Sequence, residues 1–236
     1  GGVPVGIHGN RSVSSRSGSA DGVEALGVTI DQTPADAART IEETGIGFLF
    51  APRYHPAMKH VAPVRSEMGI STVFNILGPL LNPAMAQARL IGVYDPGLVP
   101  VVAGALKELG VRRAMVVHGD GLDEITITGP TLVTELRDTI LTTREITPEE
   151  FGITRGEMES IRGGTPRENA AIIRSILSGT GGACTDIVAL NAGAAIYLGE
   201  KAPSVQEGVR AAYDAIRSGR AARTLEDLIR VSGSAA

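Results

Sequence analysis

Side chains that could do chemistry gather in three stretches, and the first is rich in small residues, hydroxyls and arginines. It runs from Ile7 to Asp21 and reads IHGNRSVSSRSGSAD. Small residues let backbone N–H groups approach an anion, and Ser and Arg side chains donate hydrogen bonds to phosphate oxygens. A helix expected from Ala20 to Leu26 would add the partial positive charge of its N-terminus. Phosphate binding is one interpretation; the other is an ordinary loop with Ser19 as a helix N-cap, since no P-loop signature is present.

The second stretch follows an expected strand and reads APRYHPAMKHVAPVR over residues 51–65. Its prolines stiffen the turn, so Tyr54 and His55 should be held at defined angles. Arg65 lies two to three helical turns farther on, and its guanidinium could pair with a substrate carboxylate through two hydrogen bonds. Taken singly, these residues are better explained as a surface Arg and a half-buried Tyr.

The third stretch places two adjacent carboxylates after a strand, in the sequence VVHGDGLDEI over residues 116–125. The carboxyl end of a strand is where α/β folds bind ligands. Asp123 and Glu124 could hold Mg²⁺, which commonly takes one or two carboxylates together with waters and substrate phosphates. The alternative is a polar turn with solvated acids, and the twelve-residue ligand pattern of an EF-hand is absent.

The remaining motifs carry no chemistry. Residues 74–83, FNILGPLLNP, predict a turn after an apolar helix. Residues 179–182, GTGG, resemble a phosphate loop but follow no strand, so we expect a turn between two helices. The four His residues lack metal-ligand spacing, and Cys184 shows no sign of being a nucleophile.

Strands and helices are expected to alternate along the chain and to position these stretches. The expected strands are 3–5, 45–50, 88–94, 113–117, a hairpin or two short strands within 124–136 around Gly129-Pro130, and 140–146. The expected helices are 34–43, 98–109, 169–177, 187–198 and 205–216, and the arginines of 217–230 should lie on a solvated helix face. Such alternation predicts an α/β fold with a mainly parallel or mixed sheet.

Composition excludes several classes of protein. The 236 residues are 43% hydrophobic, enough for a core of one or two domains and too many for disorder. The net charge of −4, with only three Lys, disfavours a nucleic-acid-binding protein, although the first twenty residues carry two Arg and no acid. No apolar run of about 18 residues predicts a membrane span. The single Cys184 and the lack of a signal peptide favour a reducing cytoplasm.

Four of these motifs, in this order, resemble the anthranilate phosphoribosyltransferase family. They are HGNRSVSS with SGSAD, APRYHPAM, FNILGPLLNP and HGDGLDE. The resemblance covers essentially the whole chain and corresponds to roughly the last two-thirds of a family member. It implies a phosphoribosyltransferase-like large α/β domain, related to nucleoside phosphorylases, with a central mixed sheet flanked by helices. Residues 1–236 would form this glycosyltransferase-family domain, with about 53–85 belonging to or contacting a small helical domain.

The resemblance also implies a reaction. The phosphoribosyl group of phosphoribosyl pyrophosphate would pass to the amine of anthranilate, with release of pyrophosphate, in tryptophan biosynthesis. Because the amine is itself the nucleophile, no catalytic residue is assigned. The family usually forms a homodimer through its helical domain, and no membrane or nucleic-acid partner is expected.

Site residues follow from the same resemblance. Those implied to bind phosphoribosyl pyrophosphate are His8, Gly9, Asn10, Arg11, Ser12, Val13, Ser14, Ser15 and Ser19. Anthranilate would contact Asn10 and Arg65, with His8, Tyr54 and His55 near its tunnel. Asp123 and Glu124 would bind Mg²⁺.

The sequence departs from the family pattern in two ways. Ile7 stands where the family normally carries Lys, and loss of a charge-assisted phosphate contact would cost about 1.5–3 kcal/mol. The family's Gly-Thr-Gly-Gly-Asp loop and Asn-x-Ser-Thr segment do not precede Gly1, so we expect a piece of a longer enzyme with little activity alone. The alternatives are a non-catalytic nucleic-acid-binding relative and a nucleoside phosphorylase; the motif at residues 51–65 favours the anthranilate enzyme.

Overall fold

The computed structural model describes residues 1–12, 17–58 and 74–234, which fall into two compact units. The two-stranded unit comprises Pro4–Met85, Gly163–Arg174 and Ala222–Ala236. The four-stranded unit comprises Gly1–Val3, Ala86–Arg162 and Ser175–Ala221. Each has its own sheet and its own helices, so each is described separately.

A pair of parallel strands forms the centre of the two-stranded unit, β1 (Val5–Gly9) and β2 (Ile46–Phe50). The expected strand at 3–5 therefore starts later and runs on through His8 and Gly9, which the sequence had placed in a loop. Pro4 has no N–H to donate to the ladder, and pairing with all five residues of β2 extends the strand beyond it.

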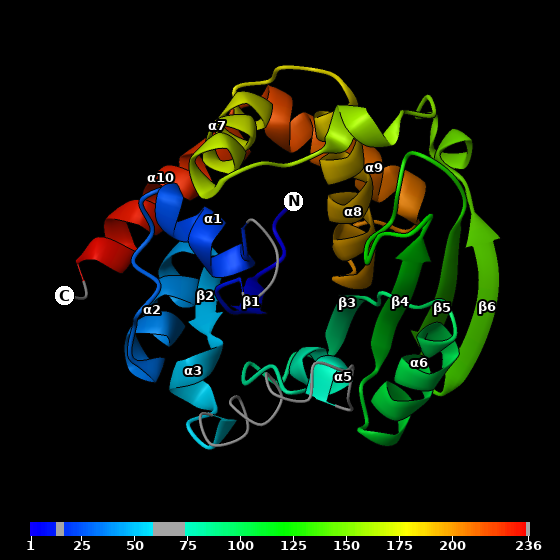
Figure 1. Cartoon of the computed structure of the whole chain (residues 1–236), viewed down its shortest axis with the longest axis horizontal. Helices are drawn as coiled ribbons and strands as arrows, with labels where there is room; N and C mark the ends of the chain where they lie inside the picture. The colour runs from blue at the N-terminus through cyan, green and yellow to red at the C-terminus, as the bar shows by residue number, and fades with distance from the viewer. Residues whose placement is uncertain (13–16, 59–73, 235–236) are drawn as a thin grey trace. The chain divides into compact units, whose positions relative to one another are not determined.

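The same unit contains helices α1 (Ser19–Ala25), α2 (Pro34–Thr44), α3 (Ala51–Tyr54) and α5 (Phe74–Leu80). Figure 1 labels each of them. The expected helix at 34–43 is confirmed as α2. Thr33 caps it by accepting a hydrogen bond from the Asp36 N–H at 3.2 Å, and Gly45 ends it with a φ of 77°.

Two later helices, α7 (Pro166–Leu177) and α10 (Arg220–Gly233), have most of their residues in the two-stranded unit. On α10, Leu228 and Val231 are buried whereas Arg223 and Arg230 are exposed. The expected solvated arginine face is therefore confirmed, and the opposite face of the helix packs into the unit.

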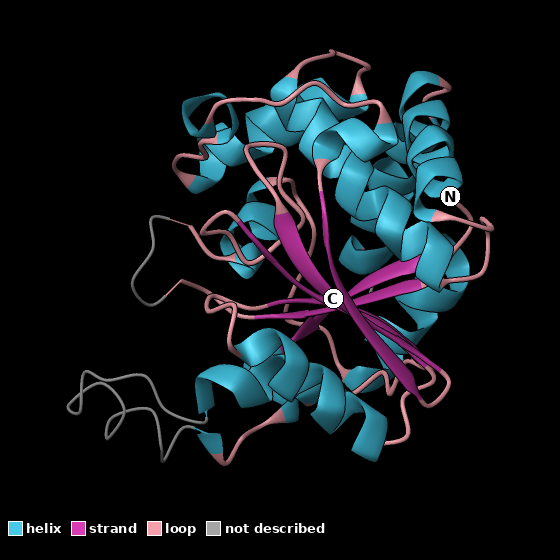
Figure 2. Ribbon diagram, turned by 90° about the vertical axis from the view of Figure 1, so that its right-hand side faces the viewer, coloured by secondary structure: helices cyan, strands magenta, loops and turns pink. Residues whose placement is uncertain are grey.

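The four-stranded unit holds a mixed sheet in the order β3 (Ala88–Gly92), β4 (Arg113–Gly119), β5 (Thr131–Arg137), β6 (Ile140–Ile146). β3 and β4 are parallel, and β4, β5 and β6 are successively antiparallel. The α/β class with a mixed sheet is confirmed, with the strands divided between two sheets (Figure 2).

The expected strand or hairpin within 124–136 is wrong in its first half. Residues 124–130 lie outside any strand, and β5 begins only at Thr131 and pairs with β4. Side chains take over the backbone bonds of this segment: the Thr126 N–H donates to Thr131 Oγ1 and the Thr128 N–H to Thr126 Oγ1, both at 3.1 Å. Local hydroxyl groups therefore replace the ladder here.

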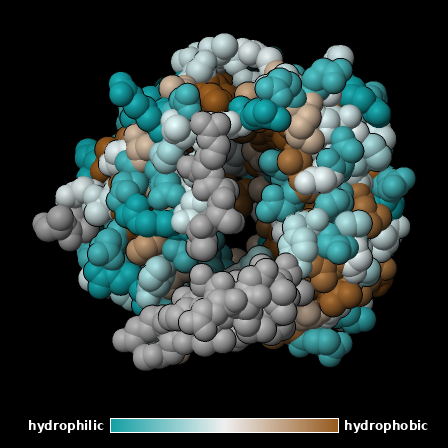
Figure 3. Space-filling model, in the orientation of Figure 1, coloured by the Kyte–Doolittle hydropathy of each residue, from teal (hydrophilic) through white to brown (hydrophobic). Residues whose placement is uncertain are grey.

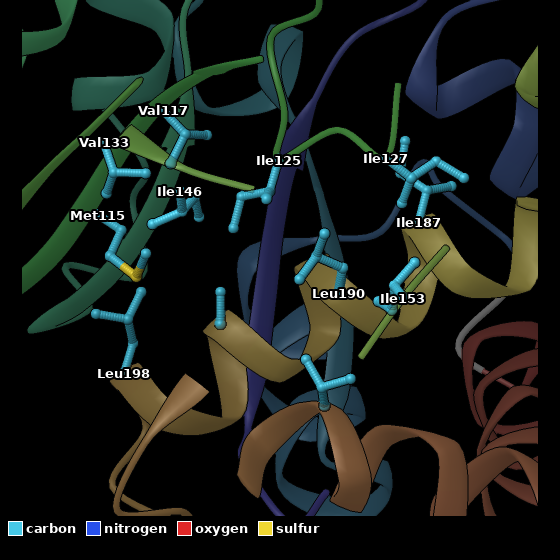
Figure 4. Close-up of a cluster of buried hydrophobic side chains, with 12 residues drawn as sticks. Met115, Val117, Ile125, Ile127, Val133, Ile146, Ile153, Ile187, Leu190 and Leu198 are labelled. Carbon is cyan, nitrogen blue, oxygen red and sulfur yellow. The ribbon is translucent and has the colours of Figure 1, made fainter. Parts of the chain in front are cut away.

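Helices α6 (Leu98–Glu108), α8 (Ala183–Leu198) and α9 (Val205–Arg217) accompany this sheet, with short 3₁₀ turns at Pro148–Phe151 and Met158–Ile161. Residues 179–182 connect α7 to α8, as expected for a turn between helices. Figure 4 shows the buried cluster that joins the sheet to α8, including Val117, Ile125, Ile187 and Leu190.

Helix α8 meets α9 through a pair of glycines. A Cβ at Gly193 would lie 2.5 Å from the Val209 nitrogen, and one at Gly208 would lie 2.2 Å from the Gly193 carbonyl oxygen. The two backbones are therefore in direct contact, and only glycine fits on either side.

Figure 3 shows hydrophobic residues on the surface where Figure 1 labels α6. Val101 on this helix and Leu109 just after it are 60% and 62% exposed. Across the helices that the structure describes, none is both long and apolar enough to cross a bilayer.

Candidate functional site

The carboxyl ends of β1 and β2 bring the first two motifs to one edge of the two-stranded unit. The strands are parallel, with Gly9 opposite Phe50. The serine-rich loop follows Gly9 and α3 follows Phe50, so both emerge at the same end. This is the edge at which open α/β sheets bind ligands.

The serine-rich loop is closed at its base by Asp21. Its carboxylate accepts hydrogen bonds from the Ser12 and Gly18 N–H groups, both at 2.9 Å. These bonds hold the pKa of Asp21 below its usual range, with the Ser12 N–H contributing most. A Cβ at Gly18 would lie 2.4 Å from the Ser12 nitrogen, so the closure needs glycine there. The Ser12 and Gly18 N–H groups, which the sequence analysis considered as donors to a phosphate, therefore donate to Asp21 instead.

Arg11 pairs with acidic side chains of α1. Its guanidinium donates to both carboxylate oxygens of Glu24, at 2.7 and 2.9 Å, and to Asp21 at 3.3 Å. The bond to Glu24 is the largest cause of the raised pKa of Arg11. The Cζ atom of the Arg11 guanidinium also lies 5.8 Å from the centre of the Phe50 ring. The sequence had not identified Glu24, because only the folded loop brings it to Arg11.

His8 and His55 lie together. Their ring centres are 5.1 Å apart in an edge-to-face arrangement. Both Nε2 atoms are buried and find no hydrogen-bond partner within 1–12, 17–58 and 74–234. Burial, then the neighbouring His55, lowers the pKa of His8, while a hydrogen bond with the Gly78 backbone acts in the opposite direction. Burial also raises the pKa of Tyr54, the residue before His55.

Other expected residues of this unit are placed as follows. Asn10 turns its Oδ1 to the Arg11 N–H at 2.8 Å, and its carbonyl accepts the Ala20 N–H at 3.2 Å. Ile7, the departure from the family pattern, packs against the apolar cluster that contains Phe48. A Cβ at Gly9 would lie 2.3 Å from Ser19 Oγ. Val13, Ser14, Ser15 and Arg65 lie outside the described residues.

Asp123 and Glu124 stand in the four-stranded unit, in the loop between β4 and β5. Two glycines let the ends of β3 and β4 approach the backbone of this pair. A Cβ at Gly92 would lie 1.5 Å from the Asp123 carbonyl oxygen, and one at Gly119 would lie 2.5 Å from that of Glu124. The acids are therefore set directly against the sheet by contacts that exclude larger side chains.

The electrostatics of this pair suit a cation. Both side chains are exposed, and no ion pair involves either within the described ranges. Neighbouring protein atoms raise the pKa of Glu124, and the Asp123 charge adds to that effect. No group of three or more His, Cys, Asp or Glu able to hold a metal occurs among the residues described. Two carboxylates fit Mg²⁺, which completes its coordination with water and phosphate oxygens.

Asp120 orders the turn before the acids, a polar turn that the Asp120-Gly121 sequence had indicated as the alternative to a metal site. It adopts a φ of 48°, followed by Gly121 at 85°. Its carboxylate accepts the Thr128 hydroxyl at 2.8 Å, so it braces the loop. The Asp-Gly pair was the available signal, because both residue types tolerate positive φ.

A hollow of about 310 Å³ lies elsewhere in the four-stranded unit, lined in part by Glu135, Arg144 and Tyr197. Its polar groups already pair: the Tyr197 hydroxyl donates to Glu135 at 2.6 Å, and Arg144 donates to Glu150 at 2.9 Å. The acid pair is therefore the stronger candidate site of this unit.

Nearly the whole chain is similar to one family of enzymes. Residues 1–222 match the model of the glycosyl transferase family a/b domain. The anthranilate phosphoribosyltransferase of Rubrobacter xylanophilus is 53% identical over 233 residues, which are 98% of this chain and 68% of that protein. The chain belongs to the anthranilate phosphoribosyltransferase family.

Solved structures of this family share the fold. The crystal structure from Thermus thermophilus matches with a TM-score of 0.93 and 48% identity, over 98% of this chain and 69% of that one. The enzyme from Saccharomyces cerevisiae in complex with PRPP and Mg matches with a TM-score of 0.88 and 31% identity, over 97% of this chain and 65% of that one. The chain thus spans about two-thirds of the length of these family members.

Proposed function

We propose that the protein transfers the phosphoribosyl group of phosphoribosyl pyrophosphate to the amine of anthranilate, with release of pyrophosphate, in tryptophan biosynthesis. The observation that carries this is the 53% identity with a named anthranilate phosphoribosyltransferase over 98% of the chain. The yeast relative, solved with PRPP and Mg, supports the same substrate and cation.

In this proposal the serine-rich loop binds phosphoribosyl pyrophosphate. The residues are His8, Gly9, Asn10, Arg11, Ser12, Val13, Ser14, Ser15 and Ser19. The closure by Asp21 presets the ends of the loop. The pairing of Arg11 with Glu24 means that its guanidinium would bind a phosphate by exchanging one anion for another.

Anthranilate would lie beside the paired histidines. Asn10 and Arg65 would contact it, with Tyr54 close to His8 and His55. The lowered pKa of His8 favours an uncharged ring at neutral pH, which suits a wall against an aromatic amine. The amine attacks the ribose carbon itself, so the chain needs only to hold the two substrates in line.

Asp123 and Glu124 would hold Mg²⁺. A bound Mg²⁺ supplies positive charge that offsets the charge building on the departing pyrophosphate. The chain contributes two carboxylates, fixed by Gly92 and Gly119, and the N–H and hydroxyl donors of its serine-rich loop.

The assembly belongs to the same proposal. Residues 1–236 would form one glycosyltransferase-family α/β domain, with about 53–85 in or against a small helical domain. The protein would form a homodimer in the cytoplasm. Light scattering on the full-length protein measures this assembly directly.

The loss of anthranilate fluorescence tests the reaction in the full-length protein. We expect it to require both phosphoribosyl pyrophosphate and Mg²⁺. Asp123→Asn and Glu124→Gln should each raise the Mg²⁺ needed for half-maximal rate at least about tenfold. Glu108→Gln, on α6, is the matched control and should behave as wild type. Phosphate-dependent cleavage of a nucleoside, or salt-sensitive DNA binding without turnover, would contradict the proposal.

A further inference from the structure

The side chain of Asn191, on α8, pairs with the peptide that follows the acid pair. Its Oδ1 accepts the Ile125 N–H at 3.0 Å, and its Nδ2 donates to the Ile125 carbonyl at 2.7 Å and to the Ile187 carbonyl at 3.0 Å. We propose that Asn191 is a positioning residue that holds Asp123 and Glu124 in place for a divalent cation. This inference rests on the proposed metal site.

The Ile125 peptide needs such a partner. It lies in the segment 124–130, where no strand supplies ladder bonds, and the Ile125 side chain is only 1% exposed. Buried N–H and C=O groups without partners are costly. An amide side chain offers a donor and an acceptor in one plane, so a single Asn satisfies both the N–H and the C=O of Ile125.

The backbone of Asn191 is held in place by the packing of α8. Its neighbour Leu190 and the preceding-turn residue Ile187 belong to the buried cluster that includes Ile125 and Ile127 (Figure 4). The close contact of α8 with α9 at Gly193 restrains the same helix two residues later. The amide is thus presented from a rigid element.

The acid pair is consequently held on two sides. Gly92 and Gly119 receive its backbone on the sheet side. Asn191 holds the next peptide from α8, one residue beyond Glu124. Without Asn191 the glycines would still permit the close approach, but the hydrogen bonds that hold the Ile125 backbone to α8 would be lost. The two carboxylates would then spread over several orientations, and a cation would bind them more weakly.

A matched control exists in the two-stranded unit. Asn169 forms the same kind of pair with Gly164, accepting its N–H at 2.7 Å and donating to its carbonyl at 3.3 Å. No carboxylate pair proposed as a metal site follows Gly164. Removing this amide tests the loss of an Asn–peptide pair without touching the acids.

The test compares wild type, Asn191→Ala, Asn191→Leu and Asn169→Leu in the full-length protein. The leucine variant removes the hydrogen bonds and keeps the side-chain volume, so it covers the case in which the alanine variant fails to fold. Mn²⁺ binding in the presence of inorganic pyrophosphate is followed by electron paramagnetic resonance. Hydrogen exchange of the peptide spanning residues 119–130 is measured in the same samples without metal.

We expect Asn191→Leu to bind Mn²⁺ about ten- to a hundredfold more weakly and to exchange faster in residues 119–130. Asn169→Leu should match wild type in both measurements. Wild-type Mn²⁺ affinity in folded Asn191→Leu, or unchanged exchange, would overturn the inference alone. Failure of wild type to bind Mn²⁺ would overturn the proposed metal site, and the inference with it.

Discussion

The serine-rich loop after β1 and the acid loop after β4 differ in the contacts that hold them, because only the first contains ion pairs among the described residues. The serine-rich loop is closed by charge: Asp21 receives two N–H groups and Arg11 pairs with Glu24. The acid loop is held by close backbone contact at Gly92 and Gly119, which no larger residue allows. The uncharged hydrogen bonds of Asn191 add to that contact. An ion pair at the surface can exchange one partner for another, whereas a close backbone contact cannot.

The difference matches the ligand proposed for each loop. A diphosphate is large and brings its own charge, so a loop held by exchangeable ion pairs can adjust to it. A small cation requires carboxylates already in position. We therefore expect the acid loop to be sensitive to an increase in side-chain volume and the serine-rich loop to be sensitive to salt.

Gly92→Ala should have the largest effect, since its Cβ would lie 1.5 Å from the Asp123 carbonyl oxygen. We expect a loss of about 1–3 kcal/mol or more in the free energy of unfolding, measured by urea denaturation. Gly104→Ala is the control, because its Cβ would meet no atom within 4 Å on α6. That variant should gain about 0.5–1 kcal/mol. Equal free energies of unfolding for the two variants would show that the acid loop does not depend on the close contact at Gly92.

Acidification should act on the two sites in opposite directions. The pKa of His8 is lowered from 6.5, so the unfolded chain takes up the proton first and stability falls as the pH drops below about 6.5. The pKa of Glu124 is raised from 4.5, so the folded chain takes up the proton first and stability rises as the pH falls toward 4.5. Urea denaturation between pH 7 and about 4.5 measures both effects. The free energy of unfolding should fall less steeply below pH 6.5 in His8→Asn, and its rise toward pH 4.5 should be absent in Glu124→Gln. Parallel profiles for wild type and both variants would contradict these assignments.

The smallest effect is expected from the Arg11–Glu24 pair. Both side chains are about half exposed, at 47% and 50%, and exposed pairs contribute little to stability. Glu24→Gln should change the unfolding midpoint slightly at low salt and not at 1 M salt, where the Debye length is about 3 Å. Glu42→Gln on α2 removes an exposed carboxylate for which no ion pair is found among the described residues, and it serves as control. A large, salt-independent effect would show that this loop too is held by packing.

Local signals in the sequence predicted much of the fold. The spacing of Ala37, Ala38 and Ile41 on one face predicted α2, because a helical period is a local property of the sequence. The segment before Thr131 was wrong because its alternating pattern is typical of a strand, whereas Thr hydroxyls and Asn191 satisfy its backbone instead.

The candidate site was predictable to the level of motifs but not of partners. The sequence placed Asp123 and Glu124 after a strand, and the strand is there. It could not pair Arg11 with Glu24, or Ile125 with Asn191, 66 positions away, since such pairs arise only from packing. The side chains that support a site therefore carry the weakest sequence signal.

The glycine pair between α8 and α9 has a consequence for how this chain can vary. Gly193 and Gly208 are both already the smallest residue, so enlargement at one position cannot be offset by reduction at the other. A collision there can be relieved only by separating the helices, which would shift Asn191 and the loop it holds. Neither glycine can therefore be replaced, even together with a change at the other. We expect the sequence of the four-stranded unit to vary less at this contact than on the exposed face of α6.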